Sequence, residues 1–210
     1  DRGVCMFGDP RPPEGCTLAG VGFEDCCPKG ARCVGPRFVV TDGFGDPRLE
    51  LWPEAYGDLD LAGGFGHAAA GLDDWDGDKV DDFAVSEPYR FGFGRVLVVS
   101  GADGSLIATF DGREESDGFG LALAALDGGA TLAVGAPFSD VGGKDAGLVS
   151  LFDHERIEVG TFAGKVELGL MGASLREIGD VDRDGWGDLV VGAPGADRSG
   201  VEGRALIVSR

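Results

Sequence analysis

Asp180-Val-Asp-Arg-Asp-Gly-Trp-Gly-Asp188, followed directly by Leu189-Val-Val-Gly-Ala-Pro194, is one of two stretches of this chain that share a pattern. The other is Asp74-Trp-Asp-Gly-Asp-Lys-Val-Asp-Asp82, followed by Phe83-Ala-Val-Ser-Glu-Pro88. Each places aspartate at positions one, three, five and nine of a nine-residue loop. Carboxylates on alternate residues of a tight turn can surround a hard divalent cation, which takes about six to eight oxygen ligands. The spacing therefore predicts two calcium sites.

The first three ligand positions also match an EF-hand, but that motif carries glutamate at position twelve and a helix on each side. Position twelve is Val85 in one loop and Val191 in the other, and the flanking runs are short and of β type. We therefore expect each loop to join two strands. Ligands are expected at positions one, three, five and nine through carboxylates and at position seven through the backbone carbonyl: Asp74, Asp76, Asp78, Val80 and Asp82, and Asp180, Asp182, Asp184, Trp186 and Asp188.

Two alternatives bear on these loops. An acidic turn is often only a solvated turn, but two loops with equal spacing favour calcium. Lys79 also stands where the second loop has Gly185, at a position that often requires positive φ, so some strain or a weaker first site is expected.

Composition narrows the class of protein. The 210 residues allow one or two domains, and the 39 glycines with 43% hydrophobic residues are typical of a turn-rich all-β protein. A formal net charge of −19 argues against nucleic acid and anionic membranes as partners. No apolar run approaches the roughly 20 residues of a membrane-spanning helix, so no membrane insertion is expected.

All five cysteines lie in the Pro/Gly-rich segment 1–36, which is too short to bury much of a core. Disulfides are its expected support, which implies an oxidising compartment and a secreted or cell-surface protein. Zinc is the weaker alternative, because no CxxC pair is present. Since the chain starts at Asp1 without a methionine, we expect a leader to have been removed. The cysteines are Cys5, Cys16, Cys26, Cys27 and Cys33.

From residue 37 onward the chain is repetitive. Strands are expected at 38–41 and 48–52, and then three repeats begin near Phe65, Phe119 and Met171. Each repeat has a Phe-Gly or Met-Gly pair, a loop, a strand ending in proline and a glycine-led strand. Fourth strands are expected at 105–110 and 157–162. The acidic loops start 106 residues apart, which is two repeats of 53. Four short strands per repeat of this length are typical of a propeller blade.

The combination of Phe-Gly, Asp-x-Asp-x-Asp and Val-Gly-Ala-Pro resembles the FG-GAP repeat of integrin α-subunit β-propellers. The resemblance covers residues 65–210 and implies four-stranded blades within a domain of 37–210, preceded by the cysteine-rich segment. It also implies that calcium binds in the acidic loops. The middle repeat has Asp127-Gly-Gly-Ala-Thr131 in place of an acidic loop, so two sites are expected and not three. Met171, in place of phenylalanine, is expected to cost little in a packed core.

Three repeats are fewer than the four to eight blades of a closed propeller. Either the remaining blades belong to a longer propeller or to another chain, or a homodimer closes a six-bladed ring. In that ring the strand at 48–52 would complete the last blade. No enzyme signature such as GxSxG, HExxH or GxxxxGK[ST] is present, so a non-enzymatic module for binding an extracellular protein or glycan is expected. The alternatives are a propeller of a polysaccharide- or lipid-acting enzyme, and a structural tile of a cell-surface assembly.

Overall fold

The computed structural model describes residues 38–41, 47–51, 63–195 and 202–209. The chain divides into two compact units, residues 1–59 and 60–210. In the first unit, β1 (Phe38–Thr41) and β2 (Pro47–Leu51) pair antiparallel, which confirms the two strands predicted there. The predicted cysteine-rich segment lies outside the described residues. Along the described part of the chain, no helix is long and apolar enough to cross a membrane.

Three antiparallel sheets make up the described part of the second unit, and each follows one predicted repeat. We call them the first, second and third blades. The first contains β3 (Ala69–Gly71), β4 (Phe83–Glu87), β5 (Arg95–Val99) and β6 (Leu106–Asp111). The second contains β7 (Ala122–Leu126), β8 (Thr131–Ala136), β9 (Leu148–Asp153) and β10 (Glu158–Ala163). The third contains β11 (Ser174–Gly179), β12 (Asp188–Ala193) and β13 (Arg204–Val208).

The strands of each blade are paired in chain order, as expected for propeller blades. The predicted fourth strands are present as β6 and β10, each shifted by about one residue from the predicted bounds. Two 3-10 turns complete the described elements: η3 (Arg90–Gly92) follows β4, and η4 (Asp127–Gly129) lies between β7 and β8. The all-β fold and the blade-like repeats predicted from the sequence are therefore confirmed.

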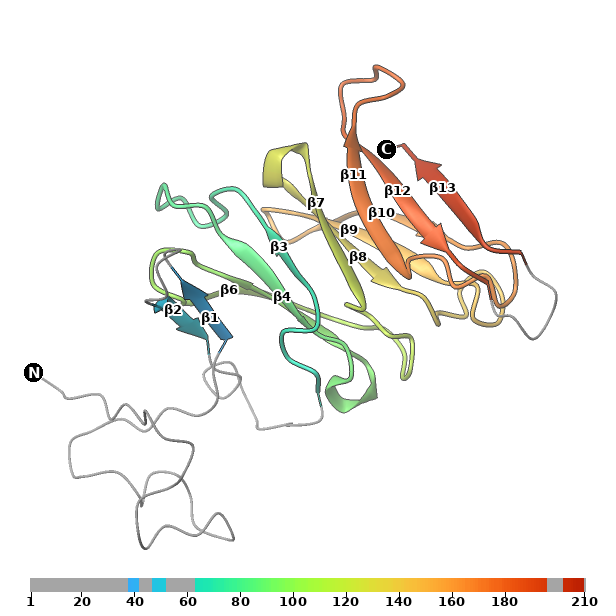
Figure 1. Cartoon of the computed structure of the whole chain (residues 1–210), viewed down its shortest axis with the longest axis horizontal. Helices are drawn as coiled ribbons and strands as arrows, with labels where there is room; N and C mark the ends of the chain where they lie inside the picture. The colour runs from blue at the N-terminus through green and yellow to red at the C-terminus, as the bar shows by residue number, and fades with distance from the viewer. Residues whose placement is uncertain (1–37, 42–46, 52–62, 196–201, 210) are drawn as a thin grey trace, which may run out of the picture. The chain divides into compact units, whose positions relative to one another are not determined.

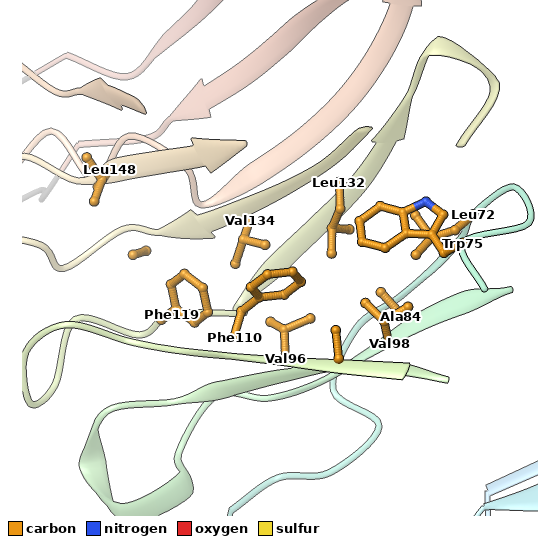
Figure 2. Close-up of a cluster of buried hydrophobic side chains, with 12 residues drawn as sticks. Leu72, Trp75, Ala84, Val96, Val98, Phe110, Phe119, Leu132, Val134 and Leu148 are labelled. Atoms are coloured by element: carbon orange, nitrogen blue, oxygen red, sulfur yellow. The ribbon is translucent and has the colours of Figure 1, made fainter. Parts of the chain in front are cut away.

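The blades lie side by side, with first strand next to first strand (Figure 1). β7 contacts β3 on one side and β11 on the other. Between the first two blades, Phe110 and Phe119 pack in one cluster of buried side chains, and the indole ring of Trp75 lies beside Leu72 and Leu132 (Figure 2). A second cluster fills the joint between the second and third blades and includes Met171, the residue predicted to pack in the core. Burial of apolar area at these joints is the main stabilising term.

The Phe-Gly and Val-Gly-Ala-Pro signatures meet where neighbouring blades touch. Gly172 has φ of 93°, and its N–H donates to the Gly192 carbonyl of its own blade at 3.1 Å. Gly135 of the second blade lies so close to Gly172 that a Cβ added to Gly135 would stand 2.1 Å from the Gly172 carbonyl oxygen. A Cβ at either position would clash with backbone atoms, which favours glycine in both signatures, although the first blade carries Ser86 at the repeat position of Gly135.

The third blade leaves an apolar face exposed that the first blade buries. Ile178, Val181 and Ile207 occupy the repeat positions of Leu72, Trp75 and Val98. The first three side chains are 37%, 54% and 63% exposed, whereas the other three are buried against the second blade. The exposed face of the third blade therefore has the composition of a blade joint.

Candidate metal centre

Both acidic loops connect the first strand of a blade to the second, and both are built by the same six hydrogen bonds. The first aspartate accepts from the backbone N–H groups at positions four, five and six, at 2.7–3.0 Å in the first loop and 2.6–3.2 Å in the second. The aspartates at positions three and five each accept from the N–H two residues later. The ninth aspartate accepts from the N–H at position two. Two independent segments thus adopt one loop conformation.

This conformation requires positive φ at positions four and six. At position six, Lys79 has φ of 74° and Gly185 has φ of 96°. At position four, Gly77 has φ of 87° and Arg183 has φ of 67°. The positive φ expected at Lys79 is confirmed, and Arg183 is a second strained position. Each loop therefore has one glycine and one side-chain-bearing residue in a region that disfavours side chains.

In each loop, three of the four predicted aspartates bring their carboxylates together. Carboxylate oxygens of Asp74, Asp76 and Asp78 lie within 4.8 Å of one another, as do those of Asp180, Asp182 and Asp188. The remaining aspartates contact other groups. Asp184 accepts from Trp186 N–H at 2.8 Å and from the Ser209 hydroxyl at 3.3 Å. The predicted position-seven residues, Val80 and Trp186, lie in the loops with exposed side chains.

The ninth aspartates, Asp82 and Asp188, are both buried but differ in their partners. Asp82 accepts from Trp75 N–H at 2.7 Å and from Gly101 N–H at 3.1 Å, so each of its oxygens has a partner. Asp188 Oδ2 accepts from Val181 N–H at 2.7 Å, whereas its buried Oδ1 has no hydrogen-bond partner in the described structure. A buried carboxylate oxygen without a partner is costly, and a hard cation would satisfy it. The second loop therefore offers oxygen ligands that could hold a divalent cation.

The closely spaced negative charges of the first loop affect the pKa values of its aspartates. Burial raises the pKa of the Asp82 carboxyl despite the hydrogen bonds from Gly101 and Trp75, and the charges of Asp76 and Asp78 raise it further. Burial also raises the pKa of Asp74, but hydrogen bonds from the backbone N–H groups of the loop, Lys79 foremost, lower it below its ordinary value. Asp74 is therefore held ionised, and a cation would relieve the repulsion felt by Asp82.

The second blade has no acidic loop, yet its short turn η4 contacts both loops. Trp75 donates from Nε1 to the Gly129 carbonyl at 2.9 Å, with its indole ring buried between the first two blades. Gly187 N–H donates to Asp127 Oδ1 at 2.6 Å. Sequence reasoning missed both contacts, because they join residues 54 and 60 positions apart in different repeats. The only sequence signal for these contacts was Trp75, a large aromatic residue within the first acidic loop.

The opposite end of the second strands presents exposed aromatic side chains. β4 runs from the first acidic loop to a loop that carries Tyr89, Phe91 and Phe93, which are 53%, 61% and 36% exposed (Figure 1). β8 leads likewise to Phe138, which is 42% exposed. In the first blade, the acidic loop and the loop that carries Tyr89, Phe91 and Phe93 therefore lie at opposite ends of β4.

A buried ion pair supports the first of these aromatic loops. Glu87, which is fully buried at the end of β4, accepts from Arg95 Nη2 at 2.8 Å and Nε at 3.2 Å. Arg90 Nη1 lies 3.5 Å from the other Glu87 oxygen, and Arg90 Cζ lies over the ring of Phe91, 4.4 Å from its centroid. The Arg90 guanidinium thus links the strand to an exposed aromatic ring.

Residues 178–208, which include the second acidic loop, match the family model of the FG-GAP repeat. The chain is 30% identical to integrin α-5 of Xenopus laevis over 144 residues, covering 62% of this chain and 14% of that protein. It is 32% identical to integrin α-PS2 of Drosophila melanogaster over 154 residues, covering 64% and 10%, respectively. It is 31% identical to integrin α-V of Gallus gallus over 163 residues, covering 65% and 15%. The matches therefore span only a small part of each relative's length.

Proposed function

Because this chain is an integrin-like FG-GAP repeat protein, we propose that it is a calcium-binding module that acts outside the cell by binding other molecules. The observation that carries the calcium proposal is the repetition of one hydrogen-bonded acidic loop in two blades, together with the buried Asp188 Oδ1, which has no hydrogen-bond partner among the described residues. The similarity to integrin α-chains supports a non-enzymatic, adhesion-type module.

Two calcium ions would be held by the ten residues predicted from the sequence. The ions would supply positive charge that offsets the crowded carboxylates and would fix the loops, so their role is structural. The first loop would use Asp74, Asp76, Asp78, Asp82 and the Val80 carbonyl, and the second Asp180, Asp182, Asp184, Asp188 and the Trp186 carbonyl.

An extracellular protein or glycan is the proposed partner, and the aromatic loops at the far end of β4 and β8 are its proposed docking face. Tyr89, Phe91 and Phe93 offer aromatic area that can stack on a sugar or fill a protein interface. Glu87 pairs with Arg95 of β5 and Arg90 of that loop, which anchors the loop to the end of β4. Integrin similarity supports a cell-surface or extracellular location for this binding.

Replacing a ligand tests the calcium proposal. Asp184→Ala and Asp78→Ala should each remove one of two bound calcium ions, because position five is a predicted carboxylate ligand of each loop. At calcium about 100-fold above its Kd, each variant should lose about 3 kcal/mol of ligand stabilisation. The melting temperature should fall in calcium and hardly change in chelator. Native mass spectrometry counts the ions and thermal melting gives the stability.

Asp81→Asn is the matched control, because Asp81 lies at position eight of the first loop and is not a predicted ligand. It should keep both ions and the melting temperature of the parent in calcium. A parent chain that binds no calcium would overturn the proposed function. An Asp184→Ala variant that retains two ions would show that the ligands of the second site are assigned wrongly.

A further inference from the structure

The turn η4 is fixed to the third blade by two hydrogen bonds that use Asp127. Its backbone N–H donates to Glu177 Oε1 at 2.9 Å, and its Oδ1 accepts from Gly187 N–H at 2.6 Å. Glu177 lies on β11, just before the second acidic loop, and Gly187 lies at position eight of that loop. The second blade has no acidic loop, but its turn η4 thus contacts the acidic loop of the third blade.

The bond to Gly187 determines how one peptide unit is oriented. In a trans peptide the N–H and the preceding C=O point in opposite directions, and the described chain has no cis peptide bond. With its N–H directed at Asp127, the Trp186–Gly187 peptide turns the Trp186 carbonyl away from Asp127. That carbonyl is the predicted position-seven ligand of the second loop. We propose that Asp127 is a positioning residue for the second calcium site, acting through this peptide, an inference that rests on the proposed calcium binding.

The second loop needs such support more than the first. The peptide that carries the Trp186 carbonyl is followed by Gly187, which has no side chain to restrict it, whereas the corresponding Val80 peptide is followed by Asp81. Close packing also explains why Gly187 is a glycine. A Cβ added there would stand 2.6 Å from Glu177 Oε1 and 3.1 Å from Asp127 Oδ1. The second loop therefore has fewer local restrictions on its backbone than the first loop, and it packs closely against η4 of the second blade.

Two substitutions at Asp127 separate orientation from charge. Asp127 has φ of 55°, so Asp127→Gly removes the side chain without adding backbone strain, and Asp127→Asn keeps the Oδ1 acceptor while removing the charge. Both are made in an Asp78→Ala background, in which calcium titration by calorimetry reports the second site. Asp127→Gly should weaken calcium binding about tenfold, as expected for one lost hydrogen bond to a ligand-bearing peptide. Asp127→Asn should bind calcium within about twofold of the background.

The reciprocal background supplies the control. With Asp182→Ala removing the second site, Asp127→Gly should leave the calcium affinity of the first site unchanged. Equal second-site affinity with and without the Asp127 side chain would overturn the positioning role, and so would equal weakening by Asn and Gly, which would make charge the cause. Equal weakening of both sites by Asp127→Gly would overturn it too, by showing general destabilisation. If the Asp78→Ala background binds no calcium, the proposed function itself fails.

Discussion

At the scale of single residues, the acidic loops depend on backbone conformations that most side chains avoid. Lys79 and Arg183 adopt positive φ in the same loop positions where the other copy has glycine. The loop framework therefore tolerates a side chain at either position but holds it under strain. Hydrogen bonds that the aspartates accept from backbone N–H groups of the loop offset that strain, which agrees with the presence of aspartate at positions one, three, five and nine of both loops.

Gly185→Ala isolates this strain. A Cβ at Gly185 would meet nothing within 4 Å, but its φ of 96° disfavours alanine. We expect a loss of about 1–2 kcal/mol in the free energy of unfolding, measured by urea denaturation in chelator. Gly71→Ala is the control, because Gly71 in β3 also has open space but no positive φ. It should be neutral or stabilise the fold. Equal effects of the two substitutions would contradict the strain argument.

At the scale of elements, the contact between neighbouring blades leaves no room for a side chain at Gly135. Gly135→Ala in β8 would place its Cβ against the Gly172 carbonyl of the third blade, and backbone atoms cannot move aside cheaply. We expect a loss of about 1–3 kcal/mol, measured by urea unfolding. Gly160→Ala in β10 is the control, since its Cβ would meet only Leu151 Cδ1 at 3.7 Å. A Gly135→Ala protein as stable as the control would rule out this role for the glycine pair.

The elements were largely predictable from the sequence, and the contacts between them were not. Alternating apolar runs and the Asp spacing predict the strands of each blade and both acidic loops, because those signals are local. The burial of Trp75 and the bond from Gly187 to Asp127 depend on which repeat stands next to which. The difference between Asp82 and Asp188 likewise comes from one distant N–H, that of Gly101. Local pattern carries no information about such partners.

At the scale of the whole molecule, the apolar face of the third blade favours association. Ile207 on β13 is 63% exposed at a position whose equivalent, Val98, is fully buried in the first blade. The sequence predicts a homodimer that closes a six-bladed ring, and this face would form part of its interface. Native mass spectrometry at micromolar concentration should detect a dimer, and Ile207→Lys should convert it to a monomer by placing a charge in the joint.

Ile157→Lys is the matched control, because Ile157 is 53% exposed but lies in the turn between β9 and β10 of the second blade. The control should keep the dimer. A folded parent that stays monomeric would show that the two-chain ring is wrong, whereas a dimer unaffected by Ile207→Lys would place the interface elsewhere on the molecule.

The position of the acidic and aromatic loops at opposite ends of one strand has a consequence for protein engineering. β4 is five residues long, so about 17 Å of mostly buried strand separates the two ends. Substitutions that far apart with no shared partner are expected to be additive. A library that varies Tyr89, Phe91 and Phe93 would therefore leave the acidic loop untouched, and the blade could display new recognition loops on an unchanged scaffold.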